Sequence, residues 1–65
     1  MKRKPLINFR GKRSQAEMAR LYDVTQQTWS YWENGVSAPS IAMMQKLEKD
    51  SGVPMQVLFY DVFNK

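Results

Sequence analysis

Five uncharged polar side chains lie close together between positions 26 and 31. They are Gln26, Gln27, Thr28, Ser30 and Tyr31. A glutamine amide carries a donor and an acceptor side by side, which match the N6 donor and N7 acceptor of adenine. Such side chains suit base edges in the major groove of DNA. Without a surrounding DNA-binding motif, the default interpretation is an ordinary solvated polar surface.

Basic residues are concentrated at the beginning of the chain. The net charge is +4, and seven of the ten lysines and arginines lie within residues 1–20, together with one acid. Such an uneven distribution indicates a polyanionic partner, with Lys12 and Arg13 as candidate phosphate ligands. The alternative is a basic terminus that only increases solubility.

Residues able to do covalent or metal chemistry are scarce. The chain has no histidine and no cysteine, so the commonest general base and the thiolate ligands are both missing. The six acids form no recognisable catalytic pair or metal-ligand set, and there is no glycine-rich phosphate loop. We therefore expect no enzymatic activity, no cofactor, no metal and no small-molecule ligand.

Helical patterns account for nearly the whole chain, which predicts an all-α fold. Residues 1–65 are expected to form one domain, with residues 1–4 as a mobile basic arm. The pattern predicts five short helices at about 5–12, 15–22, 26–34, 41–50 and from Pro54 onward. Ser14, Thr25 and Ser40 are the expected N-caps, with Glu17 completing a capping box.

The apolar residues recur at helical spacing and define the expected core. Trp29 and Trp32 share one face, and core packing is expected of them rather than stacking on nucleic-acid bases. The methionines are expected to be adaptable core filler. The other inward positions predicted are Leu6, Ile7, Phe9, Met18, Ala19, Leu21, Tyr22, Ile41, Met43, Met44, Leu47, Met55, Val57, Leu58 and Val62.

The segment from Ser14 to Ser40 reads as two capped helices joined by a tight turn. Ala19 allows the two helices to approach closely at a steep angle. The second helix then turns its polar side outward. This arrangement predicts a helix-turn-helix.

These motifs resemble the lambda-repressor-like family, the Cro/cI-type or Xre-type helix-turn-helix domains, over roughly residues 5–60. The pieces that carry the resemblance include Val24-Thr25-Gln26-Gln27-Thr28, Trp32-Glu33-Asn34-Gly35 and Pro39-Ser40. Two departures are Asp23, where the family usually has glycine, and residues 36–38, which lack the usual basic side chain. Aspartate tolerates the left-handed conformation that the turn requires.

The resemblance implies a role for individual residues. Gln26, Gln27 and Tyr31 would face base edges, with Thr28 at a base or a phosphate. Gln15 would bind one backbone phosphate, and Asn34, with the amides near Gly35, would bind another. Arg10 would pair with Glu33.

We therefore expect a sequence-specific regulator of transcription, a repressor, that binds double-stranded DNA. Its operator would be pseudo-palindromic, and it would be a weak homodimer that forms mainly on DNA. The absence of a long apolar run predicts a cytoplasmic protein with no membrane contact. The alternatives are an antitoxin, or a protein-interaction module that uses the apolar residues Val57, Leu58, Phe59 and Phe63.

Overall fold

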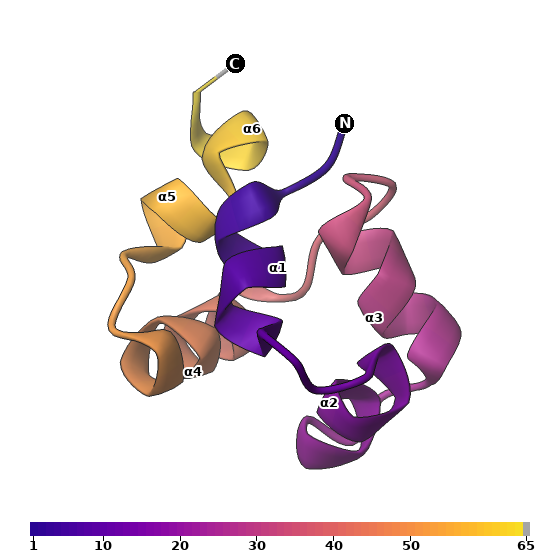
Figure 1. Ribbon diagram of the computed structural model, residues 1–65. Coiled ribbons are helices and arrows are strands. Elements are labelled where there is room, and N and C mark those ends of the chain that lie inside the picture. Colours follow the sequence, from indigo (N-terminus) through magenta and orange to yellow (C-terminus); the bar gives the residue numbers. More distant parts are fainter. Residues whose placement is uncertain (65) are drawn as a thin grey trace.

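This computed structural model describes residues 1–64, and this part of the chain contains six short helices (Figure 1). They are α1 (Lys4–Arg10), α2 (Gln15–Leu21), α3 (Gln26–Glu33), α4 (Ile41–Ser51), α5 (Met55–Leu58) and α6 (Tyr60–Phe63). The all-α prediction is confirmed. The last predicted helix is divided in two, because Phe59 leaves the helical region with φ −122° and ψ 47°.

The three predicted serine and threonine caps set the starts of the central helices. Ser14 accepts a hydrogen bond from the backbone N–H of Glu17, and Thr25 accepts one from that of Thr28. Ser40 does the same for the helix that begins at Ile41. Each cap satisfies a donor that has no partner within its own helix, so these helices begin where the sequence predicts.

The helix-turn-helix is closed by a turn at Asp23. Asp23 has φ 56°, the left-handed conformation that the sequence predicts for it. The N–H of Val24 donates to the carbonyl of Ala19 at 2.9 Å, which bonds the turn to the end of α2. Because Ala19 is small and buried, α2 and α3 pack directly against each other.

Aromatic side chains fill the centre of the core. The rings of Tyr22 and Trp29 stack with centroids 5.6 Å apart, and Trp32 packs beside Trp29 at the same distance. Both tryptophans are therefore core residues, as expected. The core is made of Leu6, Met18, Ala19, Tyr22, Trp29, Trp32, Met44, Leu47, Leu58 and Phe59.

Three apolar residues predicted to face inward are exposed instead: Leu21, Ile41 and Val57. Met18, Ala19 and Tyr22 define the buried side of their segment, and Leu21 lies about 100° around the helix from the centre of that side, so it faces solvent. Ile41 is the first residue of α4, and the side chains of this helix that pack on the core begin at Met43 and Met44. Val57 precedes the buried Leu58 and lies on the outer side of α5.

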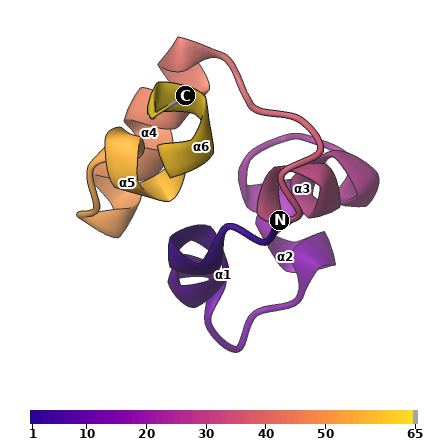
Figure 2. The ribbon, with the colours of Figure 1, turned by 90° about the horizontal axis from the view of Figure 1, so that it is seen from above.

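Helix α1 lies between the two halves of the molecule, with α2 and α3 on one side and α4 to α6 on the other (Figures 1 and 2). The expectation that residues 1–4 form a mobile arm is wrong, because Arg3, the residue before α1, is fixed in the structure. Arg3 is 3% exposed, and its backbone N–H donates to the carbonyl of Glu33 at 2.7 Å. The chain is thus attached to the end of α3 from its third residue, and Lys4 already belongs to α1.

Among residues 1–64, no helix has both the length and the apolar character that a membrane-spanning segment requires.

Candidate nucleic-acid interface

Helix α3 has a buried side and a polar outer side. Trp29, Trp32 and Glu33 are buried, whereas Gln26, Gln27 and Tyr31 are exposed. The outer side continues onto the beginning of α2. A shallow depression there is lined by Gln15, Gln26, Gln27, Ser30 and Tyr31. The structure thus places most of the predicted base-contacting side chains on one open surface that bears no formal charge.

Two of these side chains are joined. The amide Nε2 of Gln27 donates to the hydroxyl of Tyr31 at 2.6 Å. The residues are one helical turn apart, so their side chains lie on the same face. One amide hydrogen and the carbonyl oxygen of Gln27 remain for a ligand, which is the donor and acceptor pair that adenine requires. The tyrosine therefore fixes the position of the Gln27 amide and leaves one donor and one acceptor of that amide free.

Thr28 takes part in the N-cap of α3 through its backbone N–H and its hydroxyl. Its backbone N–H donates to the hydroxyl of Thr25, and the Thr25 hydroxyl also lies 2.8 Å from that of Thr28. Thr28 is half-buried, while Gln26, in the same first turn, is exposed. Gln26 is therefore the freer of the two to reach a ligand.

A buried carboxylate supports this surface from behind. Glu33 is 2% exposed, and the structure brings it together with Arg10, whose Nε donates to it at 2.6 Å. It also accepts hydrogen bonds from Trp29 at 2.7 Å and from Gln15 at 2.9 Å. Burial by itself would raise the pKa of Glu33, but these donors outweigh burial and lower the pKa below its ordinary value of 4.5. The carboxylate ties α1, α2 and α3 together in its charged form.

The residues expected at phosphates are placed differently from one another. Lys12 is exposed. Gln15 gives one amide hydrogen to Glu33 and keeps the other. Arg13 is turned back onto α1, where it donates to the carbonyls of Phe9 and Arg10 at 2.8 and 3.1 Å.

Asn34 is also turned inward. Its amide donates to the carbonyl and to the hydroxyl of Ser30, at 2.9 and 3.1 Å. A phosphate contact from the side chain of Asn34 would therefore have to replace bonds that are present here. Arg13 uses two of its five N–H donors in its bonds to α1, so it keeps donors for a phosphate, but those bonds hold the side chain against α1.

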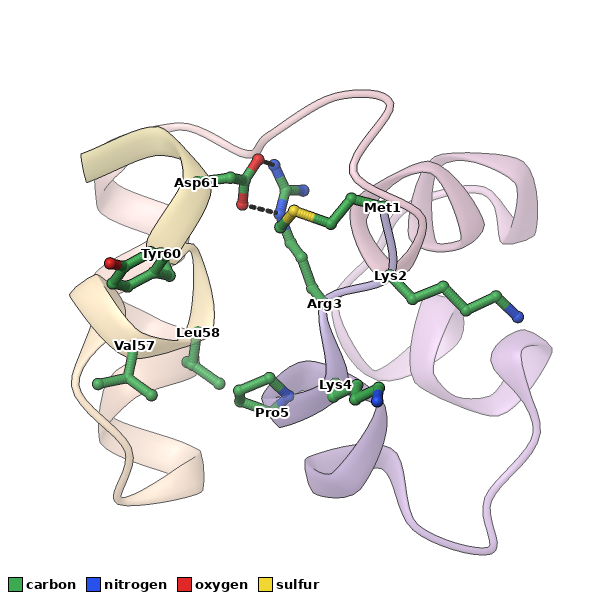
Figure 3. A pocket seen from close by; sticks show the side chains of 9 residues that line it. All are labelled: Met1, Lys2, Arg3, Lys4, Pro5, Val57, Leu58, Tyr60 and Asp61. Carbon is green, nitrogen blue, oxygen red and sulfur yellow. Dashed lines mark hydrogen bonds and ion pairs between the residues drawn. The ribbon is translucent and has the colours of Figure 1, made fainter. Parts of the chain in front are cut away.

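The apolar carboxyl end, the alternative protein-binding surface, is only partly accessible. Leu58 and Phe59 are buried in the core. Val57 and Tyr60 are exposed and line a hollow with Met1 and Pro5 (Figure 3).

Sequence reasoning missed the contact between Arg3 and Asp61, which lie 58 positions apart. The guanidinium of Arg3 donates to both carboxylate oxygens of Asp61, at 2.9 and 2.8 Å. Arg3 stands between Lys2 and Lys4 in a run of basic residues, and no periodicity or spacing in the sequence marks it as buried. Only the packing of α6 beside the N-terminus shows that this one basic residue is internal.

The comparison with protein families agrees with the geometry. The helix-turn-helix family model matches residues 8–58, which is most of the chain, and the chain belongs to this family of Cro/cI-type, Xre-type domains. Neither the comparison with curated proteins nor that with solved structures gave a match. The family is one of DNA-binding regulatory domains and not of enzymes. In this chain α2 and α3 form the helix-turn-helix.

Proposed function

We propose that this protein is a small transcriptional regulator, a repressor, that binds a specific duplex DNA sequence by inserting α3 into the major groove. The observation that supports this most directly is the division of α3 into a fully buried side and an open polar side. In this architecture the first turn of the second helix enters the groove most deeply. Gln26 and Gln27 occupy that turn, and both are exposed.

The contacts to the DNA backbone are assigned to residues with free donors. Lys12 would pair with one phosphate, and the remaining amide hydrogen of Gln15 would bind another. Arg13 and Asn34 are proposed as secondary ligands. The bonds of Arg13 to the carbonyls of α1 restrict where its remaining donors can reach, and Asn34 would have to release the Ser30 carbonyl and hydroxyl. Phosphate contacts set the position of the protein on the duplex, and base contacts set the sequence that it prefers.

The proposed complex is a homodimer on a pseudo-palindromic operator. Two copies of α3 would enter successive major-groove faces about 34–36 Å apart. We propose that the dimer is weak in solution and forms mainly on DNA. Repression would follow from occupation of promoter DNA, which excludes polymerase.

Selection from random duplexes with the purified protein tests this proposal. We expect enrichment of an inverted repeat in which each half contains at least one essential A·T pair. Gel shifts on the selected duplex should show one cooperative complex with two protomers. If no sequence is enriched, α3 does not read bases, and a protein-interaction module becomes the better account of the fold.

A further inference from the structure

All three nitrogens of the Arg3 guanidinium are engaged inside the protein. Nε and one terminal nitrogen donate to the two oxygens of Asp61 (Figure 3). The other terminal nitrogen donates to the carbonyls of Trp32 and Ser37, at 2.8 and 2.6 Å. The group also lies over the ring of Phe59, 5.2 Å from its centroid. Four of the five N–H donors of the Arg3 guanidinium therefore have partners inside the protein. Because the residue is also 3% exposed, Arg3 is an internal connector and is not available to a phosphate.

These bonds converge on the end of α3. The last carbonyls of a helix have no partner within the helix, and they carry its partial negative charge. Arg3 satisfies two of them: its side chain binds the carbonyl of Trp32, and its backbone N–H binds that of Glu33. A cation at this position stabilises the end of the helix.

The same residue also holds the segment that follows α3. Its bond to the Ser37 carbonyl fixes the loop between α3 and α4. Gly35 in that loop lies against the N-terminal residues, because a Cβ at this position would lie 2.6 Å from the Met1 carbonyl oxygen. The N-terminal segment, the end of α3 and the loop are therefore packed as one unit.

Asp61 keeps the guanidinium in this position. A two-bond fork between arginine and carboxylate fixes orientation as well as distance. Without Asp61, an almost completely buried cation would lose its counter-charge, which is strongly unfavourable. The hydrogen bonds from Arg3 lower the pKa of Asp61, so this carboxylate remains charged at neutral pH. Helix α6 thus acts on the end of α3 through one side chain.

We propose that the Arg3–Asp61 pair is a positioning device for DNA recognition. It holds the end of α3 and the following loop at the angle that specific binding needs, and it does not touch DNA itself. This inference rests on the proposed DNA-binding function. Arg3 and Asp61 are then positioning residues. Charge alone would instead suggest that Arg3 binds a phosphate and that Asp61 has no role in DNA binding.

The direction in which one substitution changes DNA affinity distinguishes a positioning role from a simple effect of charge. Asp61→Asn removes a negative charge, and by charge alone it should strengthen binding to any DNA. A positioning role predicts weaker binding to the selected operator, with little loss on a scrambled duplex. Arg3→Lys keeps the charge but cannot form the fork, so it should act in the same direction.

The experiment measures the dissociation constant for the selected operator and for a scrambled duplex of the same length. The wild type is compared with Asp61→Asn, Arg3→Lys and the control Asp50→Asn. The control removes the charge of an exposed acid on α4, outside the helix-turn-helix, and the asparagine carbonyl can still accept the hydrogen bond from the Tyr22 hydroxyl. The readout is the dissociation constant for the scrambled duplex divided by that for the operator, which measures the preference for the operator. Any unfolded fraction lowers both affinities equally and cancels in this ratio.

We expect the ratio to fall roughly two- to thirtyfold in Asp61→Asn and Arg3→Lys, the range typical of residues that act at a distance. It should stay at the wild-type value in Asp50→Asn. Asp61→Asn is the milder change in shape, so it decides the question if Arg3→Lys does not fold. An unchanged or increased ratio in Asp61→Asn overturns the proposal. If the wild type itself fails to bind any duplex, the DNA-binding function is wrong, and the positioning role fails with it.

Discussion

The indole N–H of Trp29 donates to the carboxylate of Glu33, 2.7 Å away and one turn further along α3. Trp29 is the centre of the aromatic core, and Glu33 is the acceptor that joins α3 to α1 and α2. One helix therefore carries both the packing and the polar bonds that hold its outer face in place. Changes at Glu33 should affect stability and DNA binding together.

Glu33→Gln should destabilise the protein and weaken DNA binding. It leaves Arg10 without its counter-charge, which costs about 3–5 kcal/mol when both partners are fully buried. The cost should be smaller here, because the side chain of Arg10 is 23% exposed. Urea unfolding and operator affinity measure the two effects. The exposed Glu17→Gln is the control, and equal behaviour of the two variants would show that the buried bonds do not orient α3.

Stability should fall in acid, because the pKa values of Glu33 and Asp61 are both lowered in the folded protein. A lowered folded pKa means that the unfolded chain binds more protons in this range, so stability rises with pH. The contribution should be complete above the ordinary values of 4.5 and 3.8, and it should be lost as the pH falls through the folded values. Urea midpoints between neutral pH and pH 2 measure this. Glu33→Gln should show a smaller loss over the same interval than the wild type.

Alanine at Gln26 or Gln27 should relax base selection at one position in each half-site. The cost of replacing the matching base pair, about 1–3 kcal/mol in the wild type, should disappear. Selection experiments on each variant, with Gln45→Ala on α4 as the control, measure this. The salt dependence of binding should hardly change, because no phosphate contact is removed. If all four proteins select the same operator with the same stringency, α3 does not read bases.

Tyr31→Phe tests the bond that holds Gln27. It removes the hydroxyl that accepts from the Gln27 amide and leaves the glutamine itself in place. We expect partial relaxation at the position read by Gln27, weaker than with Gln27→Ala. Competition between duplexes that differ at that base pair gives the size of the effect. A complete loss would instead indicate that the Tyr31 hydroxyl contacts the DNA directly.

Lys12→Gln should lower the slope of log affinity against log salt by about 0.9 for each phosphate that the side chain no longer neutralises, with base preference unchanged. Lys49→Gln on α4 is the matched exposed control. Arg13→Gln should change the slope less than Lys12→Gln, because two bonds to carbonyls of α1 hold the Arg13 side chain against that helix, whereas Lys12 is exposed. A slope that is the same in all three variants and the wild type would show that this end of the chain is only a solubilising terminus.

The sequence by itself determined where the three central helices begin and which two of them form the helix-turn-helix. A cap needs only a hydroxyl and a backbone N–H three residues further on, so Ser14, Thr25 and Ser40 set their helices by local geometry. The burial of Trp29 and Trp32 follows from their shared face. The pairing of Arg10 with Glu33 was implied by the family resemblance, since their positions relative to the helices are part of that pattern.

Only the tertiary structure decided which side chains are buried where the local sequence pattern does not determine it. Arg3 looks like one more basic residue of a terminal arm until α6 brings Asp61 to it. Leu21 and Ile41 fit the apolar stripes of their helices but have no element packed over them. In each case the outcome depends on which surfaces meet in space. Contacts between distant parts of the chain leave no periodic or spacing signal in a single sequence, whereas contacts within a helix do.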